Sequence, residues 1–132
     1  MKSYLVDTQI LVWSLISPDR LSSAILERLS SGQIYTSQIS LLEIAIKQKI
    51  NKLPELQISI EELERTIVRD GFQVIPLKSK HIAAYREIPL FANHRDPFDR
   101  LLLATAYSEN IAMISADLNF NLYSNLIELI EA

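Results

Sequence analysis

The chain has 132 residues, of which 48% are hydrophobic and 22% are charged, and its formal net charge is −3. This composition is ordinary for one globular domain and excludes a fibrous or intrinsically disordered chain, so we expect residues 1–132 to form a single domain. The chain has no cysteine, two glycines and two histidines. These counts exclude disulfide frameworks, zinc–cysteine sites, multi-histidine metal sites and glycine-rich phosphate-binding loops.

No apolar stretch of the sequence is long enough to cross a membrane. The apolar run 10–16 covers about one third of the ~20 residues that a spanning helix needs. Asp7 interrupts the apolar stretch near the N-terminus, and no small-residue cleavage site follows Ile16, which disfavours a signal peptide. We therefore expect an unprocessed cytoplasmic protein with no membrane partner.

Short apolar strands alternate with helices along the chain. We predict strands at 4–6, 34–36, 72–77, 111–114 and 126–130. We predict helices at 10–16, from 22 or 23 to 29, and at 41–47, 59–71, 79–87 and 97–108. The strands are continuously apolar, which is typical of parallel strands covered on both faces. The sequence therefore predicts an α/β fold with a mostly parallel sheet.

Acidic residues are expected to gather at one edge of this sheet, because open parallel sheets bind ligands beyond the carboxyl ends of their strands. Asp7 directly follows the first strand, and Glu43 lies in the helix after the second. Asp96 and Asp99 open the helix before the fourth strand, and Asp117 lies shortly after that strand.

Each acid taken alone has a structural explanation. Asp96, Pro97 and Asp99 form a favourable helix start, and the segment 40–43 (Ser-Leu-Leu-Glu) has the same capping form. The helix dipole favours acids in a first turn by about 0.3–1 kcal/mol each. Asp7 is the exception, because an unpaired acid at the end of a buried strand is costly.

The acids together indicate a metal site. Four carboxylates at about 5 Å would repel by roughly 3 kcal/mol per pair at an effective dielectric of about 20, so they require a cation. Oxygen donors favour Mg²⁺ or Mn²⁺, which can activate a water for phosphodiester hydrolysis. Without Asp7, Glu43, Asp99 and Asp117, the chain would have 13 cationic and 12 acidic residues. This balance of +1 need not repel a polyanion.

Over nearly its whole length the sequence resembles the PIN-domain ribonucleases, and specifically the VapC-type toxins of bacterial toxin–antitoxin pairs. The similar segments are 4–13, 37–47, 94–106 and 114–120. Segment 94–106 is the most specific, because the spacing of Asp99 to Ala104 and Ala106 matches the family's third acid and small-residue helix.

The resemblance implies a three-layer α/β/α PIN-like fold with a central sheet of about five strands. It implies an endoribonuclease dependent on Mg²⁺ or Mn²⁺, a homodimer, and a small VapB-type antitoxin that blocks the site. The implied catalytic residues are Asp7, Glu43, Asp99 and Asp117, of which the three aspartates bind metal and Glu43 acts through water. We expect the antitoxin to insert a cationic side chain, since a guanidinium pairs bidentately with carboxylates.

Several positions depart from the family pattern. Gln9 stands where His or Asn is common, Ser115 replaces the usual Thr, and Asn119 stands where a further Asp often occurs. The last departure removes any fifth carboxylate, which predicts weaker binding of a second metal ion and not inactivity. The secondary candidates for the site are Thr8, Asp96, Ser115 and Asn119.

Other polar residues near the acids have two interpretations each. Lys47, Arg95 and Arg100 are candidates for contacts with RNA phosphates. Alternatively, Lys47 belongs to a solvated helix end and the two arginines pair with Asp96. His94 either orients a water or makes a loop hydrogen bond, and the neighbourhood of Trp13 favours a place in the core over an interface.

Three alternative functions have to be distinguished from a nuclease. A phosphoacceptor receiver domain needs adjacent acids after the first strand and a late lysine, but Thr8 and Gln9 follow Asp7. A haloacid-dehalogenase-like phosphatase needs a second Asp where Gln9 stands. A non-catalytic PIN-like binding module is disfavoured by the complete set of four acids, and a metal-dependent cleavage assay decides this question.

Overall fold

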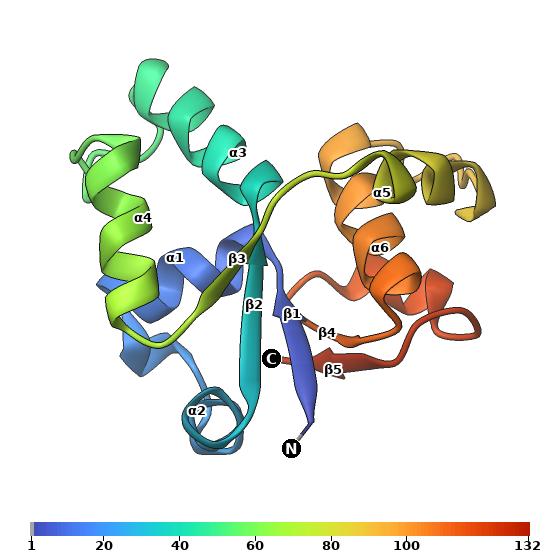
Figure 1. Cartoon of the computed structure of the whole chain (residues 1–132), viewed down its shortest axis with the longest axis horizontal. Helices are drawn as coiled ribbons and strands as arrows, with labels where there is room; N and C mark the ends of the chain where they lie inside the picture. Colours follow the sequence, from blue (N-terminus) through green and yellow to red (C-terminus); the bar gives the residue numbers. More distant parts are fainter. Residues whose placement is uncertain (1) are drawn as a thin grey trace.

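Five parallel strands form the centre of the protein in the computed structural model, which describes residues 2–132 (Figure 1). The strands are β1 (Ser3–Val6), β2 (Gln33–Ser37), β3 (Gln73–Ile75), β4 (Ala112–Ser115) and β5 (Leu129–Glu131). Their order in the sheet is β3-β2-β1-β4-β5, and every neighbouring pair is parallel. The predicted parallel sheet of five strands is therefore confirmed.

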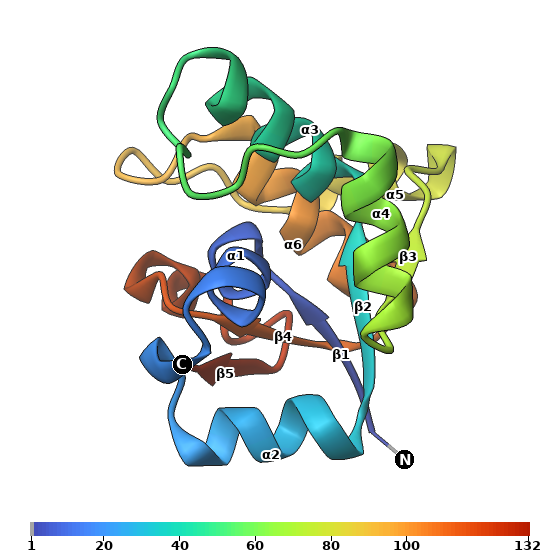
Figure 2. The ribbon, with the colours of Figure 1, turned by 90° about the vertical axis from the view of Figure 1, so that its left-hand side faces the viewer.

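Helices cover both faces of the sheet, which gives three layers (Figures 1 and 2). On one face lie α1 (Thr8–Ile16), α2 (Ser23–Ser31) and α4 (Ile60–Arg69). On the other face lie α5 (Ser79–Ala84) and α6 (Pro97–Glu109). Side chains of β1 alternate between the two cores: Val6 packs into the first and Leu5 into the second. Both faces are thus buried, which explains why the strands are apolar throughout.

The strand order changes direction at β1, and this positions the cleft. From β1 the chain adds β2 and β3 on one side, and α5 and α6 then carry it back to β4 on the other side. Right-handed connections in opposite directions place their helices on opposite faces. The carboxyl ends of β1 and β4 therefore lie where the two helix layers separate, which is where open α/β sheets bind ligands.

Helix α3 (Gln38–Lys49) stands at this carboxyl edge and contributes to both cores, with Ile44 in one and Ile39 in the other. Its start differs from the prediction. The Ser37 side chain caps the helix by accepting from the Ile39 N–H at 3.1 Å, whereas Ser40 is buried inside the helix. The capping role predicted for segment 40–43 is therefore wrong, because Ser37 at the end of β2 already provides the cap.

The last strand and the fifth predicted helix are shorter than expected. Only 129–131 pair with β4, because Ile127 turns into the core after the 3₁₀ helix η3 (Leu118–Tyr123). The helix predicted at 79–87 divides into α5 and a 3₁₀ turn, η2 (Tyr85–Glu87). A third 3₁₀ turn, η1 (Pro18–Arg20), follows α1.

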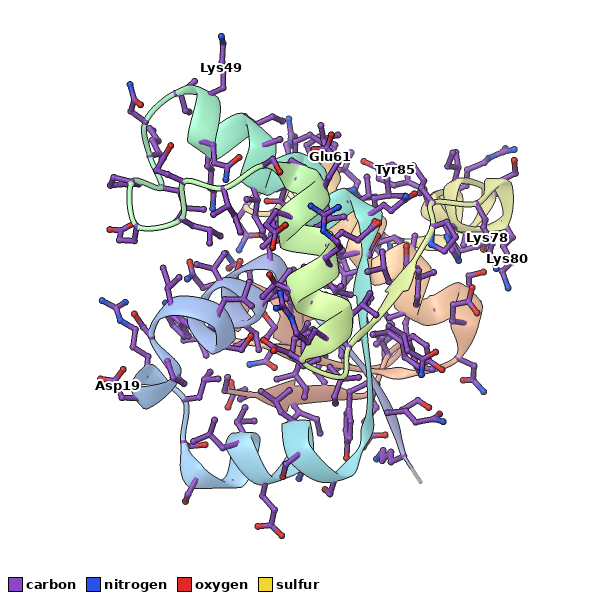
Figure 3. The ribbon with its side chains drawn as sticks, turned by 60° about the vertical axis from the view of Figure 1, so that its left-hand side comes forward. Asp19, Lys49, Glu61, Lys78, Lys80 and Tyr85 are labelled. Atoms are coloured by element: carbon purple, nitrogen blue, oxygen red, sulfur yellow. The ribbon has the colours of Figure 1, made fainter. Side chains whose placement is uncertain are left out.

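Charged side chains project from the periphery of the three layers. Figure 3 shows Lys49 extending from the end of α3, and Lys80 extending from α5 on the opposite side of the sheet. Within residues 2–132, no helix combines the length and apolar character needed to cross a bilayer.

Candidate active site

Asp7 links the first strand to the first helix. Its Oδ1 accepts a hydrogen bond from the Ile10 N–H at 2.8 Å, so it caps α1, and its Oδ2 accepts from the Ser115 hydroxyl at 2.5 Å. The residue is buried, and burial raises the pKa of its carboxyl above the ordinary value. Because α1 follows β1 directly, the Asp7 carboxylate is held rigidly at the carboxyl end of the central strand.

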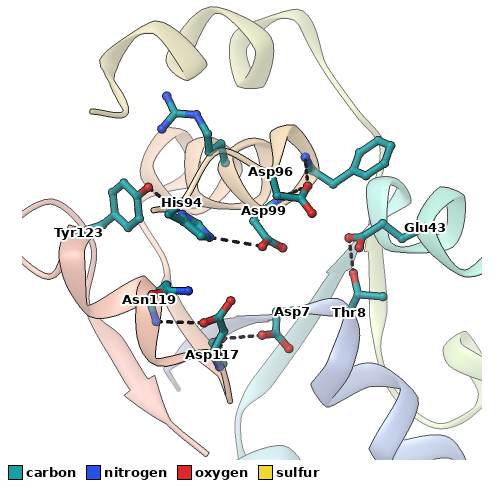
Figure 4. Close-up of polar contacts among 12 residues, drawn as sticks. Asp7, Thr8, Glu43, His94, Asp96, Asp99, Asp117, Asn119 and Tyr123 are labelled. Atoms are coloured by element: carbon teal, nitrogen blue, oxygen red, sulfur yellow. Dashed lines mark hydrogen bonds and ion pairs between the residues drawn. The ribbon is translucent and has the colours of Figure 1, made fainter. Parts of the chain in front are cut away.

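Glu43 approaches the same place from α3. Its Oε1 accepts a hydrogen bond from the Thr8 hydroxyl at 2.7 Å (Figure 4). The Thr8 and Ser40 hydroxyls lie 2.8 Å apart. Burial raises the pKa of Glu43. Thr8, a secondary candidate in the sequence, therefore connects the first turn of α1 to the glutamate of α3.

Asp96 and Asp99 occupy different positions at the start of α6. Asp96 caps the helix, as predicted: its Oδ1 accepts from the Phe98 N–H at 2.8 Å and the Asp99 N–H at 3.4 Å. Asp99 lies within the first turn, where burial, followed by the charges of Asp96 and Glu43, raises its pKa to about 7. This large shift shows that Asp99 lies in a desolvated, strongly negative environment.

Asp117 follows β4 and is tied to Asp7 through one residue. The Ser115 hydroxyl that donates to Asp7 also accepts from the Asp117 N–H at 2.9 Å. Asp117 Oδ1 accepts from the Asn119 N–H at 2.9 Å, which makes Asp117 the cap of η3. Ser115 and Asn119 therefore position the two strand-end aspartates, and Asn119 does so through its backbone.

The structure also brings into the site His94, for which the sequence left open a role in orienting a water or in a loop hydrogen bond. His94 is buried, with Nδ1 2.7 Å from the Tyr123 hydroxyl and Nε2 3.3 Å from Asp99 Oδ2 (Figure 4). Burial lowers the pKa of His94. One nitrogen of His94 and one carboxylate oxygen each of Asp99 and Asp117 all lie within 4.8 Å of one another. Its proximity to Asp99 in sequence was an available signal, but nothing local indicated Tyr123.

These side chains surround a cleft of about 490 Å³. The residues that line it are Asp7, Thr8, Gln9, Trp13, Glu43, Lys47, Asp96, Asp99, Ala116 and Asp117. All four predicted acids are thus brought together, with Asp96 beside them. A divalent cation such as Mg²⁺ or Mn²⁺ fits this donor set, because the donors are hard carboxylate oxygens. Burial, followed by the charges of neighbouring acids, raises the pKa values of Asp7, Glu43 and Asp99.

The three predicted phosphate-binding residues have different surroundings. Arg100 is buried, and its guanidinium donates to the Ile88 carbonyl at 2.7 Å, to the Pro89 carbonyl and to the Tyr85 hydroxyl. Loop 85–89 thus uses three of the five N–H donors of Arg100 and holds it as a buried structural residue, so its phosphate contact stays a prediction. Lys47 lines the cleft, whereas Arg95 is exposed in the loop before α6.

Trp13 also differs from its sequence interpretation. It packs against the apolar core on the α1 face, as expected, but part of the ring lines the acidic cleft. The sequence contained a signal for this position of Trp13. Gln9 and Trp13 are four residues apart, so they lie on the same side of α1.

The PIN domain family model matches residues 4–126, and the chain therefore belongs to the PIN domain family. No curated protein sequence matches the chain significantly. The family expected from the four sequence segments is confirmed.

Solved structures of toxin–antitoxin systems share the fold. VapBC2 from Rickettsia felis, in a structure bound to a promoter DNA fragment, matches with a TM-score of 0.69 and 20% identity over 98% of each chain. VapBC-1 from nontypeable Haemophilus influenzae matches with a TM-score of 0.67 and 18% identity over 98% of this chain and 97% of the other. A toxin–antitoxin complex from Klebsiella pneumoniae matches with a TM-score of 0.55 and 18% identity, covering 96% of this chain and 95% of the other.

Proposed function

We propose that the protein is an endoribonuclease dependent on Mg²⁺ or Mn²⁺ and acts as the toxin of a toxin–antitoxin pair. The observation that carries this proposal is the convergence of Asp7, Glu43, Asp99 and Asp117 on one cleft in a chain of the PIN family. The fold shared with VapBC structures supports the biological role.

The residues divide the chemistry among them. Asp7, Asp99 and Asp117 would hold the divalent cation, and a cation bound there would activate a water and neutralise charge on the phosphate. Glu43, fixed by Thr8, orients a water, and its raised pKa allows its carboxylate to accept a proton from that water. Lys47, in the wall of the cleft, binds a phosphate oxygen of RNA. Ser115 keeps Asp7 and Asp117 in register.

The partners follow from the same site. A small antitoxin of the VapB type inhibits the enzyme by placing a cationic side chain among the carboxylates, where Mg²⁺ competes weakly with it. The toxin itself is a homodimer. An antitoxin complex that retains full nuclease activity would contradict this inhibitor role.

The alternatives lack support in the cleft. A receiver domain or a haloacid-dehalogenase-like phosphatase needs a second acid directly after β1, and Thr8 and Gln9 occupy those positions. A non-catalytic PIN-like module would not need four acids whose repulsion must be neutralised. An RNA cleavage assay therefore distinguishes a nuclease from a non-catalytic PIN-like module.

The decisive experiment incubates the purified chain with single-stranded RNA. We expect cleavage with Mg²⁺ or Mn²⁺, none in EDTA, and none with Asp7→Asn, which keeps an oxygen to cap α1. Asp19→Asn alters an exposed acid in η1 and is the matched control. Full cleavage in EDTA would contradict the metal mechanism.

Expression should also slow growth, and equal toxicity of Asp7→Asn would show that the harm is not nuclease chemistry.

A further inference from the structure

A second, smaller hollow adjoins the acidic cleft along α1. Its volume is about 170 Å³, and Gln9 and Trp13 line both spaces. The hollow continues past Trp13 to Arg20 in η1, with Glu55 from the segment after α3 on its wall. The acidic cleft and this hollow, which share Gln9 and Trp13, are together called the path along α1.

Trp13 is held at the junction of this path. The indole packs against the apolar core, and the Arg20 guanidinium carbon lies 5.6 Å from the ring centroid, in cation–π contact. The indole is thus held in a fixed orientation, and its partly exposed side lines the acidic cleft. Gln9 lies one helical turn before it and is exposed, so its amide can donate and accept hydrogen bonds.

The charges along the path suit a single nucleic acid strand. Lys47 lies on the wall of the acidic cleft and Arg20 on the wall of the hollow, with the indole lining both spaces. Single strands are bound by cations that follow the phosphates and by aromatic rings on which unpaired bases stack. Glu55 is the only acid lining the smaller hollow among the described residues. Val12, Ile16 and Leu53 also line the smaller hollow, so a peptide segment is the alternative occupant that the test must distinguish.

We propose that Trp13 and Gln9 form a nucleobase subsite, in which an unpaired base next to the scissile phosphate stacks on the indole, the Gln9 amide contacts the base edge, and Arg20 binds the adjoining phosphate. The inference rests on the proposed function, because it assigns a role to the RNA flanking the cleaved bond. It also explains selection of single strands, since a paired base cannot reach the ring.

Trp13 is the only tryptophan in the chain, so its fluorescence reports on this subsite alone. Glu43→Gln with Mg²⁺ is titrated with a short single-stranded RNA, the same RNA carrying abasic residues, and the same RNA as a duplex. We expect saturable quenching by the base-bearing single strand, and little by the other two. Equal quenching by the abasic strand would overturn the proposal, as would quenching by an antitoxin peptide with none by RNA.

Cleavage kinetics give the second measurement. In the otherwise unchanged chain, Trp13→Leu should raise KM roughly tenfold with kcat nearly unchanged, and Trp13→Phe should restore most of the affinity. One abasic residue beside the cleaved bond should raise KM for the unsubstituted enzyme and not for Trp13→Leu. Tyr107→Leu, which changes an exposed aromatic residue on α6 outside both spaces, is the matched control.

The two proposals fail in different ways. Quenching that depends on the base, without cleavage by the unsubstituted chain, would contradict the proposed function and retain the subsite. Metal-dependent cleavage with the same abasic penalty in Trp13→Leu as in the unsubstituted enzyme would overturn the subsite and retain the nuclease.

Discussion

Helix α6 has a carboxylate near each end that contacts a histidine from another segment. The two histidine–carboxylate pairs differ in their surroundings. At the C-terminal end, buried His81 accepts from the Lys78 N–H through Nδ1, and its Nε2 lies 2.6 Å from Glu109. Lys80 also pairs with Glu109, at 3.0 Å. At the N-terminal end, His94 contacts Asp99 beside four further carboxylates of the cleft.

The carboxyl groups respond in opposite directions. Hydrogen bonds from His81 and then Lys80 lower the pKa of Glu109, whereas burial and neighbouring acids raise the pKa of Asp99 to about 7. Glu109 is a neutralised partner that joins α5 to α6. Asp99 lies in an environment with surplus negative charge, which a cation would relieve. The same residue types thus form a structural clamp at one end of α6 and a reactive group at the other.

The largest expected effect comes from removing the carboxylate of Asp99, with removal of the Glu109 carboxylate as the comparison. Asp99→Asn should lower kcat by more than roughly 100-fold with little change in stability, since even partners of metal ligands typically contribute 10–100-fold. Glu109→Gln should leave kcat unchanged. Steady-state cleavage and urea unfolding of both variants measure this. Comparable kcat losses at the two ends would break the contrast between them.

Replacing the histidines should separate activity from stability. His94→Gln should reduce cleavage by about 10–100-fold, because Asp99 loses the partner that orients it. His81→Gln should leave kcat unchanged and lower the free energy of unfolding by about 1–3 kcal/mol, because buried partners lose their hydrogen bonds. Tyr123→Phe removes only the hydroxyl that contacts His94 Nδ1 and provides a milder test of the His94–Asp99 pair. If His81→Gln impaired kcat as much as His94→Gln, the division of roles would be wrong.

Asp96 tests whether the two neighbouring acids of α6 are distinct. Asp96→Ala should cost about 0.5–2 kcal/mol of stability through loss of the helix cap and should retain appreciable cleavage. Asp96→Asn keeps a capping oxygen and should be milder in both respects. Urea midpoints and kcat of the two variants decide this. A dead Asp96→Asn with an active Asp99→Asn would assign the third metal carboxylate to Asp96.

The last expected effect is a pH dependence of stability in metal-free protein. Asp99 ionises near pH 3.8 when unfolded and near pH 7 when folded, so the folded state binds more protons between these values. The free energy of unfolding should therefore fall as pH rises through this window. Asp99→Asn should reduce this decrease of the free energy of unfolding with pH. Glu109→Gln should not, because the lowered pKa of Glu109 gives stability that is lost only as pH falls. Urea midpoints between pH 4 and 7.5 provide the measurement, and an unchanged slope in Asp99→Asn would contradict the assignment.

Local patterns in the sequence determined the sheet, most helices and the edge where the acids meet. Continuously apolar strands indicate burial on both faces, and the Asp96-Pro97 start of α6 satisfies capping rules that act within one turn. Asp7 and Asp117 follow strands directly, so a parallel sheet suffices to place both at one edge.

Tertiary structure decided which of several similar local features is used. Ser37 and Ser40 both offer a helix cap, and only the end of β2 selects Ser37. Arg100 became structural because the carbonyls of Ile88 and Pro89 required donors. The contact of His94 with Tyr123 spans 29 residues, and the place of Trp13 beside the cleft depends on how α1 packs. Such contacts depend on chain packing at long range, which periodicity and spacing within one segment do not encode.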